Sequence, residues 1–411
     1  LERRVAHGVF GYTAVPGSYY EAVDRWFGRR HGWHIDRGSV IYTTGVVPAI
    51  SAIIKAVCRP GESVIVQTPA YNCFFSSIRN NGCLLADNRL LYNKADGSYS
   101  IDFEGLERLA RRPDVTCLLL CNPHNPSGRV WTPGELRRIG DICLSNGVFV
   151  ISDEIHCELV YGGREYTPYA TLGEEYARAS ASCVSPSKAF NIAGLQIANI
   201  VAADPVRRAA IDKAININEV CDVNPFGVAA TEAAYNRGGE WLDRLTGYLH
   251  DNYRLVRGFF AEYLPQYRVT PLEATYLAWI NVECTGLPGD QIAEILTEKA
   301  AVRLNGGAMY GPGGENFVRS LHVLRPDGMI VLLPSDRKAE ADEAAVAYGV
   351  GNYRHILMHS SGEGMRRIAD LLAGGRLRVH VDSVFPFGEI ARAHERLEGG
   401  GVRGKVVVAM E

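Results

Sequence analysis

Three short segments contain side chains that could catalyse a reaction, and each follows directly on an apolar run. They are residues 122–128 (Asn-Pro-His-Asn-Pro-Ser-Gly), 152–156 (Ser-Asp-Glu-Ile-His) and 185–188 (Ser-Pro-Ser-Lys). The amine of Lys188 could act as a nucleophile or base, and the carboxylate of Asp153 could hold a cation in place. Each segment also has a structural explanation: a rigid turn for the Asn-Pro pairs, a helix cap for Asp153 and a solvated charge for Lys188. Taken one by one, the segments leave both interpretations open.

The surrounding sequence predicts how these segments are positioned. Between residues 42 and 204, short apolar runs alternate with amphipathic stretches, which predicts strand–helix units and a mostly parallel sheet. The strongest apolar runs are residues 63–67, 115–121, 148–152 and 179–184. Ligands of such sheets bind at the carboxyl ends of the strands, so the segments after the runs are predicted to meet in one site.

Helix signals accompany the predicted strands. Residues 132–135 (Thr-Pro-Gly-Glu) form a capping box with proline at the first helical position, and Pro48 is predicted to open another helix. Residues 273–279 are predicted to form a later strand that borders the cleft.

Composition narrows the possible functions. The 411-residue chain is long enough for two or three domains. The chain has a formal net charge of −3 and so lacks the excess of basic residues that binds nucleic acids or membrane surfaces. We therefore expect a small-molecule substrate and neither of those partners. The ten cysteines show no zinc-ligand spacing, which predicts no metal site and reduced thiols in a cytoplasmic protein. The sequence has no apolar run of about 18 residues, so no membrane span is expected.

Together, the motifs resemble a known family. Residues 68–72 (Thr-Pro-Ala-Tyr-Asn), 122–128, 152–156 and 187–196 (Ser-Lys-Ala-Phe-Asn-Ile-Ala-Gly-Leu-Gln) resemble fold-type I pyridoxal-phosphate enzymes, the aminotransferase class I/II superfamily. Within it they look like the C-S lyase branch, the cystathionine β-lyases, from residue 1 to 319. The resemblance implies an α/β fold with a large domain around a mostly parallel sheet and a smaller α+β domain.

The resemblance implies a role for each residue around the cofactor ring. Lys188 would hold pyridoxal 5'-phosphate as a Schiff base and then take the proton from the substrate Cα. Asp153 would pair with the pyridine nitrogen and keep it protonated. Asn125 and His156 would hydrogen-bond the ring phenolate oxygen, and Tyr71 would stack on the ring face, although core packing would also explain Tyr71.

Further residues are implied at the phosphate. Gly45, Val46 and Val47, which precede the helix expected from Pro48, would offer backbone N–H groups to the phosphate dianion. Ser185 and Ser187 would add hydroxyl donors.

The resemblance extends to the substrate and to a second subunit. Arg319 would bind the substrate α-carboxylate in a bidentate pair. Tyr12 would reach the phosphate of the neighbouring subunit, which implies a homodimer with composite sites. The implied division is a small domain of residues 1–15 and 241–319, which is incomplete, and a large cofactor-binding domain of residues 16–240.

A different resemblance begins after Arg319. Residues 320–411 resemble the C-terminal end of zinc-type medium-chain alcohol dehydrogenases and quinone reductases. The nucleotide fingerprint and metal ligands of those enzymes lie further upstream and are absent here, so this segment implies neither a nicotinamide site nor a metal site.

The expected activity is β-elimination from cystathionine or a related cysteine S-conjugate, giving a thiol, pyruvate and ammonia. Many aminotransferases carry a phosphate-binding arginine eight residues after the lysine, where this chain has Gln196. That difference favours a lyase. An aminotransferase on the same scaffold and a catalytically inactive fusion or regulatory protein are the alternatives.

Overall fold

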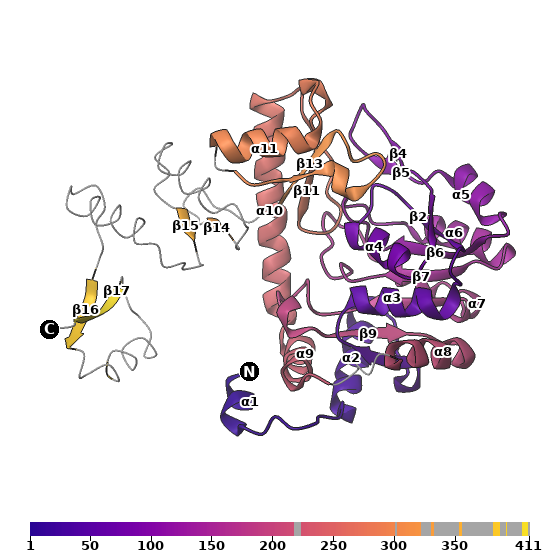
Figure 1. Cartoon of the computed structure of the whole chain (residues 1–411), viewed down its shortest axis with the longest axis horizontal. Helices are drawn as coiled ribbons and strands as arrows, with labels where there is room; N and C mark the ends of the chain where they lie inside the picture. Colours follow the sequence, from indigo (N-terminus) through magenta and orange to yellow (C-terminus); the bar gives the residue numbers. More distant parts are fainter. Residues whose placement is uncertain are drawn as a thin grey trace. The chain divides into compact units, whose positions relative to one another are not determined.

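A computed structural model describes residues 1–217, 223–300 and 302–321, together with residues 330–332, 353–355, 381–386, 392 and 405–409. The chain divides into two compact units (Figure 1). Unit 1 comprises Leu1–Gly328 with Glu340–Val350, and unit 2 comprises Met329–Ala339 with Gly351–Glu411. Among the helices described, none is long and apolar enough to cross a membrane.

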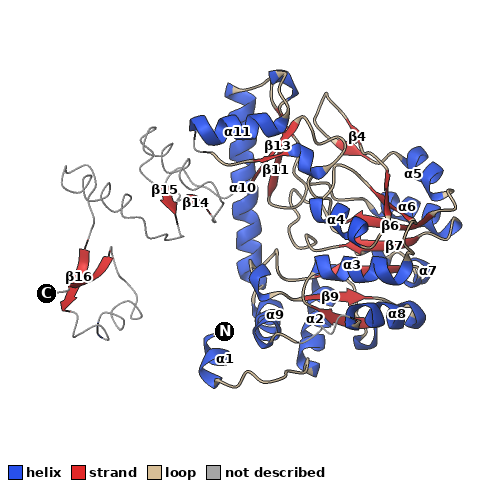
Figure 2. Cartoon of the chain, viewed as in Figure 1, coloured by secondary structure: helices blue, strands red, loops and turns tan. Residues whose placement is uncertain are grey.

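A seven-stranded sheet forms the centre of unit 1 (Figure 2). Its strands are β1 (Val40–Thr43), β2 (Ser63–Val66), β3 (Leu84–Asp87), β6 (Val115–Cys121), β7 (Phe149–Asp153), β8 (Ser180–Val184) and β9 (Ala198–Val201). They lie in the order β1-β9-β8-β7-β6-β2-β3. Only β9 runs antiparallel to its neighbours in this sheet. The predicted mostly parallel α/β sheet is therefore confirmed.

Helices cover both faces of this sheet because alternate strand residues are apolar on both sides. On β6, Cys117 and Leu119 belong to one buried cluster, whereas Leu118 and Leu120 belong to another. The first cluster contains residues of α3 (Val46–Val57), α4 (Asn72–Asn80) and α8 (Pro205–Asn216). The second contains residues of α5 (Phe103–Ala110), α6 (Pro133–Ser145) and α7 (Glu174–Arg178).

Further helices and short strands complete unit 1. The helices are α1 (Glu2–His7), α2 (Gly17–His31), α9 (Pro225–Arg237), α10 (Gly239–Tyr263) and α11 (Gly289–Ala300). A four-stranded antiparallel sheet has the order β10-β11-β13-β12, formed by β10 (Arg268–Val269), β11 (Leu277–Asn281), β12 (Asn305–Gly306) and β13 (Phe317–Leu321). Strands β4 (Leu91–Tyr92) and β5 (Tyr99–Ser100) pair as a separate hairpin.

Several predicted boundaries need correction. Strand β2 ends at Val66 rather than at residue 67, and β7 and β8 each begin one residue later than predicted, at Phe149 and Ser180. Helix α3 begins at Val46 rather than at Pro48, so Val46 and Val47 lie in its first turn. Strand β7 extends one residue further than predicted and ends at Asp153. Strand β11 begins only at Leu277, because the buried Thr275 has a φ of 71°, which no β-strand residue adopts.

In unit 2, the described residues form two parallel strand pairs. Strand β14 (Ile330–Leu332) pairs with β15 (Tyr353–His355), and β16 (Val381–Pro386) pairs with β17 (Lys405–Ala409). In the C-terminal segment the sequence also predicts helices around residues 364–373 and 389–397, which lie outside the described residues except for Arg392, which is helical. The predicted domain boundaries after residues 15, 240 and 319 stay predictions.

Candidate active site

The carboxyl ends of three neighbouring strands lie level with one another in the large sheet. The strand register places Cys121 of β6 and Cys183 of β8 on either side of Asp153 of β7. The backbone N–H of Asn122 also donates to the carbonyl oxygen of Asp153 at 2.9 Å. The three chemically active segments follow directly on these strand ends, so they emerge along the same edge of the sheet, as the sequence predicted.

Asp153 is a buried acid, with 4% of its surface exposed. Its Oδ1 accepts one hydrogen bond, from the Ile155 N–H at 3.2 Å. A turn, not an α-helix, follows at residues 155–158, so Asp153 caps no helix. Burial raises the pKa of Asp153 to about 7, although the Ile155 N–H and the charge of Lys188 lower it. A cation placed next to this carboxylate would therefore stabilise its charged form.

Lys188 lies in the turn that follows β8. The Phe190 N–H donates to the Pro186 carbonyl at 2.9 Å and the Ile192 N–H donates to the Ser187 carbonyl at 3.0 Å, which fixes the backbone on both sides of the lysine. The side chain is half-buried. Its positive charge acts on both Asp153 and His156. The amine is therefore close to the predicted carboxylate and imidazole.

Three predicted ligand residues have polar atoms with nothing to bind in the protein. Asn125 Oδ1, His156 Nδ1 and Arg319 Nε are among thirteen buried side-chain N and O atoms of the described residues that have no hydrogen-bond partner. Buried polar atoms are nearly always paired, so these three are available to a polar group that the protein itself does not supply. Pyridoxal phosphate and its amino-acid substrate fit the two nitrogen atoms: a carboxylate can accept from Arg319 Nε, and a phenolate oxygen can accept from a protonated His156 Nδ1. Asn125 would donate to the phenolate through its amide N–H, because its Oδ1 is an acceptor.

His156 is neutral in this environment. Burial, together with the positive charges of Lys188 and Arg319, lowers the pKa of His156 to about 3. The Tyr276 ring meets the imidazole edge-on, with ring centroids 5.8 Å apart. A neutral imidazole can accept or donate one hydrogen bond on each side, as a ligand of an oxygen atom requires.

Tyr71 and Arg319 are close enough to influence one another. Tyr71 immediately precedes α4, packs edge-on against Phe74 at 5.9 Å and lies partly buried against the apolar cluster under α3. Burial raises the pKa of Tyr71, Asp153 raises it further, and the charge of Arg319 lowers it. Tyr71 therefore both packs against the core and borders the charged site.

Arg319 is held from one side by a residue that the sequence did not single out. Its Nη1 donates to the hydroxyl of Tyr310, and strand pairing places Arg319 opposite Trp279 of β11 and Asn305 of β12. Tyr276 beside His156 lies in the segment of residues 273–279 that was predicted to border the cleft, but the sequence assigned it no role. The pairing of Ala274 with Val160 brings Tyr276 to His156, and the hydrogen bond from the Ala70 N–H to the Tyr310 carbonyl holds Tyr310 near the segment that contains Tyr71.

The phosphate candidates occupy two different environments. Gly45 is the N-cap of α3, and Val46 and Val47 are its first two residues, so their N–H groups have no carbonyl partner within the helix. The Ser185 hydroxyl, in contrast, already donates to the Ile197 carbonyl at 2.6 Å and accepts from the Ser187 N–H at 3.1 Å. The amides of α3 are thus the free donors, while Ser185 stabilises the lysine turn.

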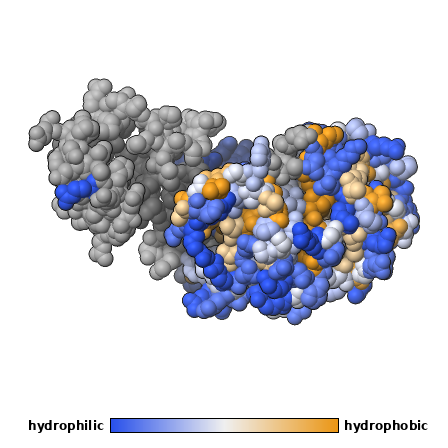
Figure 3. Space-filling view, turned by 90° about the horizontal axis from the view of Figure 1, so that it is seen from below, coloured by the Kyte–Doolittle hydropathy of each residue, from blue (hydrophilic) through white to orange (hydrophobic). Residues whose placement is uncertain are grey.

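Tyr12 lies outside the site of its own chain. Its side chain is fully exposed, and it belongs to an N-terminal segment that also exposes Val5, Val9 and Phe10. Phe10 attaches this segment to α9 through a ring contact with Phe226 at 5.4 Å. Several apolar patches of this kind interrupt the hydrophilic surface in the space-filling view (Figure 3).

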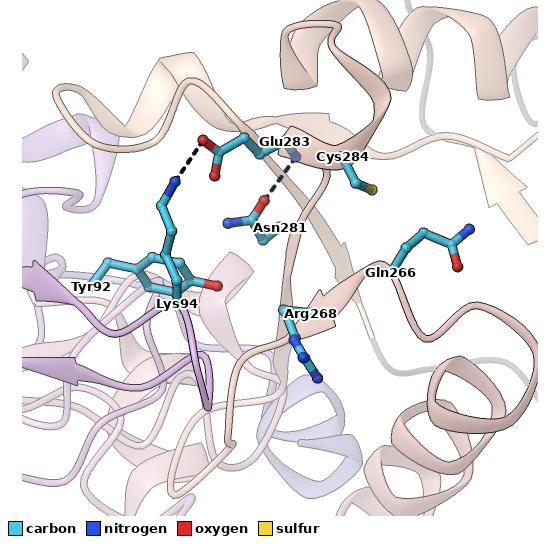
Figure 4. Close-up of a pocket in the computed structure, with 7 residues that line it drawn as sticks. All are labelled: Tyr92, Lys94, Gln266, Arg268, Asn281, Glu283 and Cys284. Atoms are coloured by element: carbon cyan, nitrogen blue, oxygen red, sulfur yellow. Dashed lines mark hydrogen bonds and ion pairs between the residues drawn. The ribbon is translucent and has the colours of Figure 1, made fainter.

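A cavity elsewhere in unit 1 contains none of the predicted residues. It measures about 300 Å³ and lies beside β10, the end of β11 and the hairpin of β4 and β5 (Figure 4). Lys94 and Glu283 form an ion pair of 2.8 Å across it. A second group, His31, Cys157 and Glu158, has the composition of a metal site. Trp26 and Arg30 already donate to Glu158, so this group is explained as a buried ion-pair network.

Comparisons with known proteins agree with this geometry. Residues 6–319 match the family Aminotransferase class I and II. The chain is 41% identical over 319 residues to cystathionine beta-lyase PatB of Bacillus subtilis, covering 78% of this chain and 82% of that protein. Cystalysin from Treponema denticola, solved with pyridoxal 5'-phosphate, is 34% identical with a TM-score of 0.76, over 78% and 81% of the two chains. A pyridoxal-phosphate-bound C-S lyase from Staphylococcus hominis is 30% identical with a TM-score of 0.72, over 77% and 82%.

The C-terminal part matches a second family. Residues 307–408 match the family Zinc-binding dehydrogenase, which overlaps the first match at residues 307–319 and agrees with the resemblance of the tail. The first match covers most of the chain and contains every residue of the candidate site. The chain therefore belongs to the aminotransferase class I and II family.

Proposed function

We propose that this protein is a pyridoxal-phosphate-dependent carbon–sulfur β-lyase that acts on cystathionine or a related cysteine S-conjugate. The observation that carries the proposal is the proximity of Asp153 and Lys188 after the neighbouring strands β7 and β8, with the charges of Lys188 and Arg319 both acting on the buried His156. The similarity to lyases of the same family supports the reaction. Gln196, which leaves the phosphate without an arginine partner at that position, favours a lyase over an aminotransferase.

The residues present would hold the cofactor as follows. Asp153 would face the ring nitrogen, Asn125 and His156 the phenolate oxygen, and Tyr71 the ring face. The amides of Gly45, Val46 and Val47 would receive the phosphate, with Ser187 as a further donor and Ser185 as the residue that fixes the turn. When bound, pyridoxal phosphate supplies an electron sink that weakens the bonds around the substrate Cα.

The protein residues would carry out the remaining steps. Arg319, oriented by Tyr310, would bind the α-carboxylate and so fix which Cα bond faces Lys188. The free amine of Lys188 would then take the Cα proton. Loss of a thiolate from Cβ and addition of one water molecule give the thiol, pyruvate and ammonia, which balances the reaction.

We also propose that the functional unit is a cytoplasmic homodimer. The fully exposed side chain of Tyr12 supports a role at another subunit, because it is free to contact a second chain. The nine cysteines in the described residues are all free thiols, which fits a reducing compartment.

An assay without any keto acid tests the proposed reaction. With cystathionine, the cofactor-loaded protein should release pyruvate, ammonia and a thiol. Lys188→Ala should abolish this release, whereas Lys213→Ala, at an exposed position of α8, should retain it. Strict dependence on 2-oxoglutarate with glutamate as product would instead identify an aminotransferase. Cofactor binding without either activity would favour the inactive alternative.

A further inference from the structure

Three thiols gather where α3 ends, away from the candidate active site. Cys58 is the C-cap of α3, Cys83 lies just before β3 and Cys117 lies on β6. All three belong to the same apolar cluster, and none forms a disulfide. Neither the proposed lyase reaction nor the cofactor uses them, so their proximity needs a separate explanation.

Cys58 and Cys83 lie beside two turns, residues 60–61 and 81–82, that are hydrogen-bonded to each other. The Gly61 N–H donates to the Gly82 carbonyl at 2.8 Å, and the Leu84 N–H donates to the Glu62 carbonyl at the same distance. The Cys83 thiol donates to the carbonyl oxygen of Arg59 at 3.6 Å. Because Arg59 is the residue after Cys58, the sulfur of Cys83 lies next to the backbone that carries the other thiol.

Cys58 is the one of the three thiols whose surroundings favour the thiolate, and 8% of its surface is exposed. The Thr116 hydroxyl donates to its sulfur at 3.3 Å. A hydrogen bond with Cys117 lowers the pKa of Cys58, as do those with Thr116 and Cys83, while burial and Glu62 raise it. Burial raises the pKa of Cys83 to about 11 and that of Cys117 well above its usual range. The thiolate is the reactive form, so an oxidant should attack Cys58 first.

We propose that Cys58 and Cys83 form a redox modification site for hydroperoxides. The Cys58 thiolate attacks the peroxide oxygen, which gives a sulfenic acid at Cys58 and releases hydroxide or an alkoxide. The Cys83 thiol then attacks the Cys58 sulfur, forming the disulfide and releasing water. The peroxide is thereby reduced by two electrons, which the two thiols supply.

Cys83 suits the second step better than Cys117 does. A disulfide requires the two Cα atoms to approach within about 7 Å, so one partner must be able to shift. Cys83 is 6% exposed and lies in a turn, whereas Cys117 is fully buried in a strand paired with both β2 and β7. The disulfide would join the end of α3 to the turn that leads into β3.

Peptide mapping of the peroxide-treated holoenzyme tests the proposal. The background should be Cys284→Ser, because Cys284 is exposed and could link two chains. After mild hydrogen peroxide treatment and thiol blocking, a non-reducing tryptic digest should contain peptide 56–79 joined to peptide 80–89. Fragmentation must place the bond at Cys58, because Cys73 lies in the same peptide. Two thiols should be lost per chain and regained on reduction.

Matched variants separate the two chemical steps. Cys83→Ala should abolish the cross-link and leave a sulfenic acid at Cys58 that a 1,3-dione labels. Cys58→Ala should leave Cys83 unoxidised at the same peroxide dose, and Cys73→Ala should keep the cross-link. A bond from Cys58 to Cys117, or an intact Cys58 at a dose that oxidises Cys284 in the unsubstituted protein, would overturn the proposal. If a variant folds poorly, the peptide map of the protein with all its native cysteines still shows whether Cys58 and Cys83 become cross-linked.

Discussion

Asp153 is expected to lower the stability of the protein while it has no cofactor. Burial raises its pKa from 3.8 to about 7, so the folded chain binds this proton more tightly than the unfolded chain does. Stability that depends on such a proton is fully present below the unfolded pKa and is lost as the pH rises through the folded one. The contribution of Asp153 should therefore decline between about pH 4 and pH 7.

Asp153→Asn should stabilise the cofactor-free protein in a pH-dependent manner. A shift of about three pKa units corresponds to a gain of at most roughly 4 kcal/mol at pH 8, and the gain should shrink as the pH approaches 4. Urea unfolding at pH 5 and pH 8 measures the difference, with the exposed Asp212→Asn as control. An equal effect at both pH values would show that the carboxylate charge is not its source.

The same substitution should have the opposite effect on the loaded enzyme. Asparagine cannot keep the ring nitrogen protonated, so lyase turnover should fall sharply, as should affinity for the cofactor. A residue that lowers the stability of the fold but is needed for catalysis shows these opposed effects, which are typical of active sites.

At the scale of single elements, helix α6 shows how local sequence specifies structure. The Thr132 hydroxyl accepts from the Glu135 N–H at 3.2 Å, and the Glu135 carboxylate accepts from the Thr132 N–H at 2.8 Å, as the capping box predicted. Each partner satisfies a donor that the helix itself cannot pair.

Removing this cap should have a measurable but modest cost. Thr132→Ala should lower the free energy of unfolding by about 1 kcal/mol, because the exposed side chain contributes little besides the hydrogen bond. Thr132→Ser keeps the hydroxyl and should cost much less. Chemical denaturation of both variants gives the comparison, and equal losses would attribute the effect to the lost methyl group instead.

The elements that the sequence predicted well are those with local signals. Strand β6 has its predicted bounds, and capping fixes the start of α6. Thr275 shows where prediction from local sequence fails. Its β-branched side chain favours a strand, yet its φ is 71°, so β11 begins only at Leu277. Such a conformation is imposed by distant contacts, here the hydrogen bond from the Thr275 N–H to the Leu159 carbonyl.

The same distinction applies to the candidate site. Asp153 and Lys188 follow apolar runs and could be singled out from the sequence, because parallel strands bring their carboxyl ends to one edge. The roles of Tyr276 and Tyr310 could not, because these tyrosines reach His156 and Arg319 through contacts between segments far apart in the sequence, such as the bridge between Val160 and Ala274. The Ser185 hydroxyl likewise has a partner, the Ile197 carbonyl, that no local pattern predicts.

At the scale of the whole molecule, the proposed dimer makes each active site depend on two chains. If Tyr12 acts in the neighbouring subunit, Tyr12→Phe and Lys188→Ala should complement each other when mixed. In a hybrid dimer, one site combines the intact Lys188 of one chain with the intact Tyr12 of the other. Equal mixing should restore about a quarter of the wild-type sites. Lyase activity before and after subunit exchange measures this gain, which should not appear if Tyr12 acts within its own chain.

The C-terminal segment is expected to bind no nicotinamide nucleotide, although it resembles a dehydrogenase. Residues 399–404 do have the spacing Gly-x-Gly-x-x-Gly. In a nucleotide-binding fold that turn must follow a strand and open a helix, so that the helix N-terminus can receive the pyrophosphate. Here strand β17 begins at the residue after Gly404, so the glycines precede a strand and not a helix.

Isothermal titration of the full-length protein with NADH and NADPH tests this expectation. No saturable heat should appear at micromolar concentrations, because the glycines have no helix N-terminus behind them to supply backbone donors. A titration with pyridoxal phosphate under the same conditions serves as the positive control for a correctly folded sample. Micromolar binding of either nucleotide would contradict the expectation. If Lys188→Ala left that binding unchanged, the nucleotide would bind at a site other than the cofactor site, and the segment would form it without a strand–turn–helix unit.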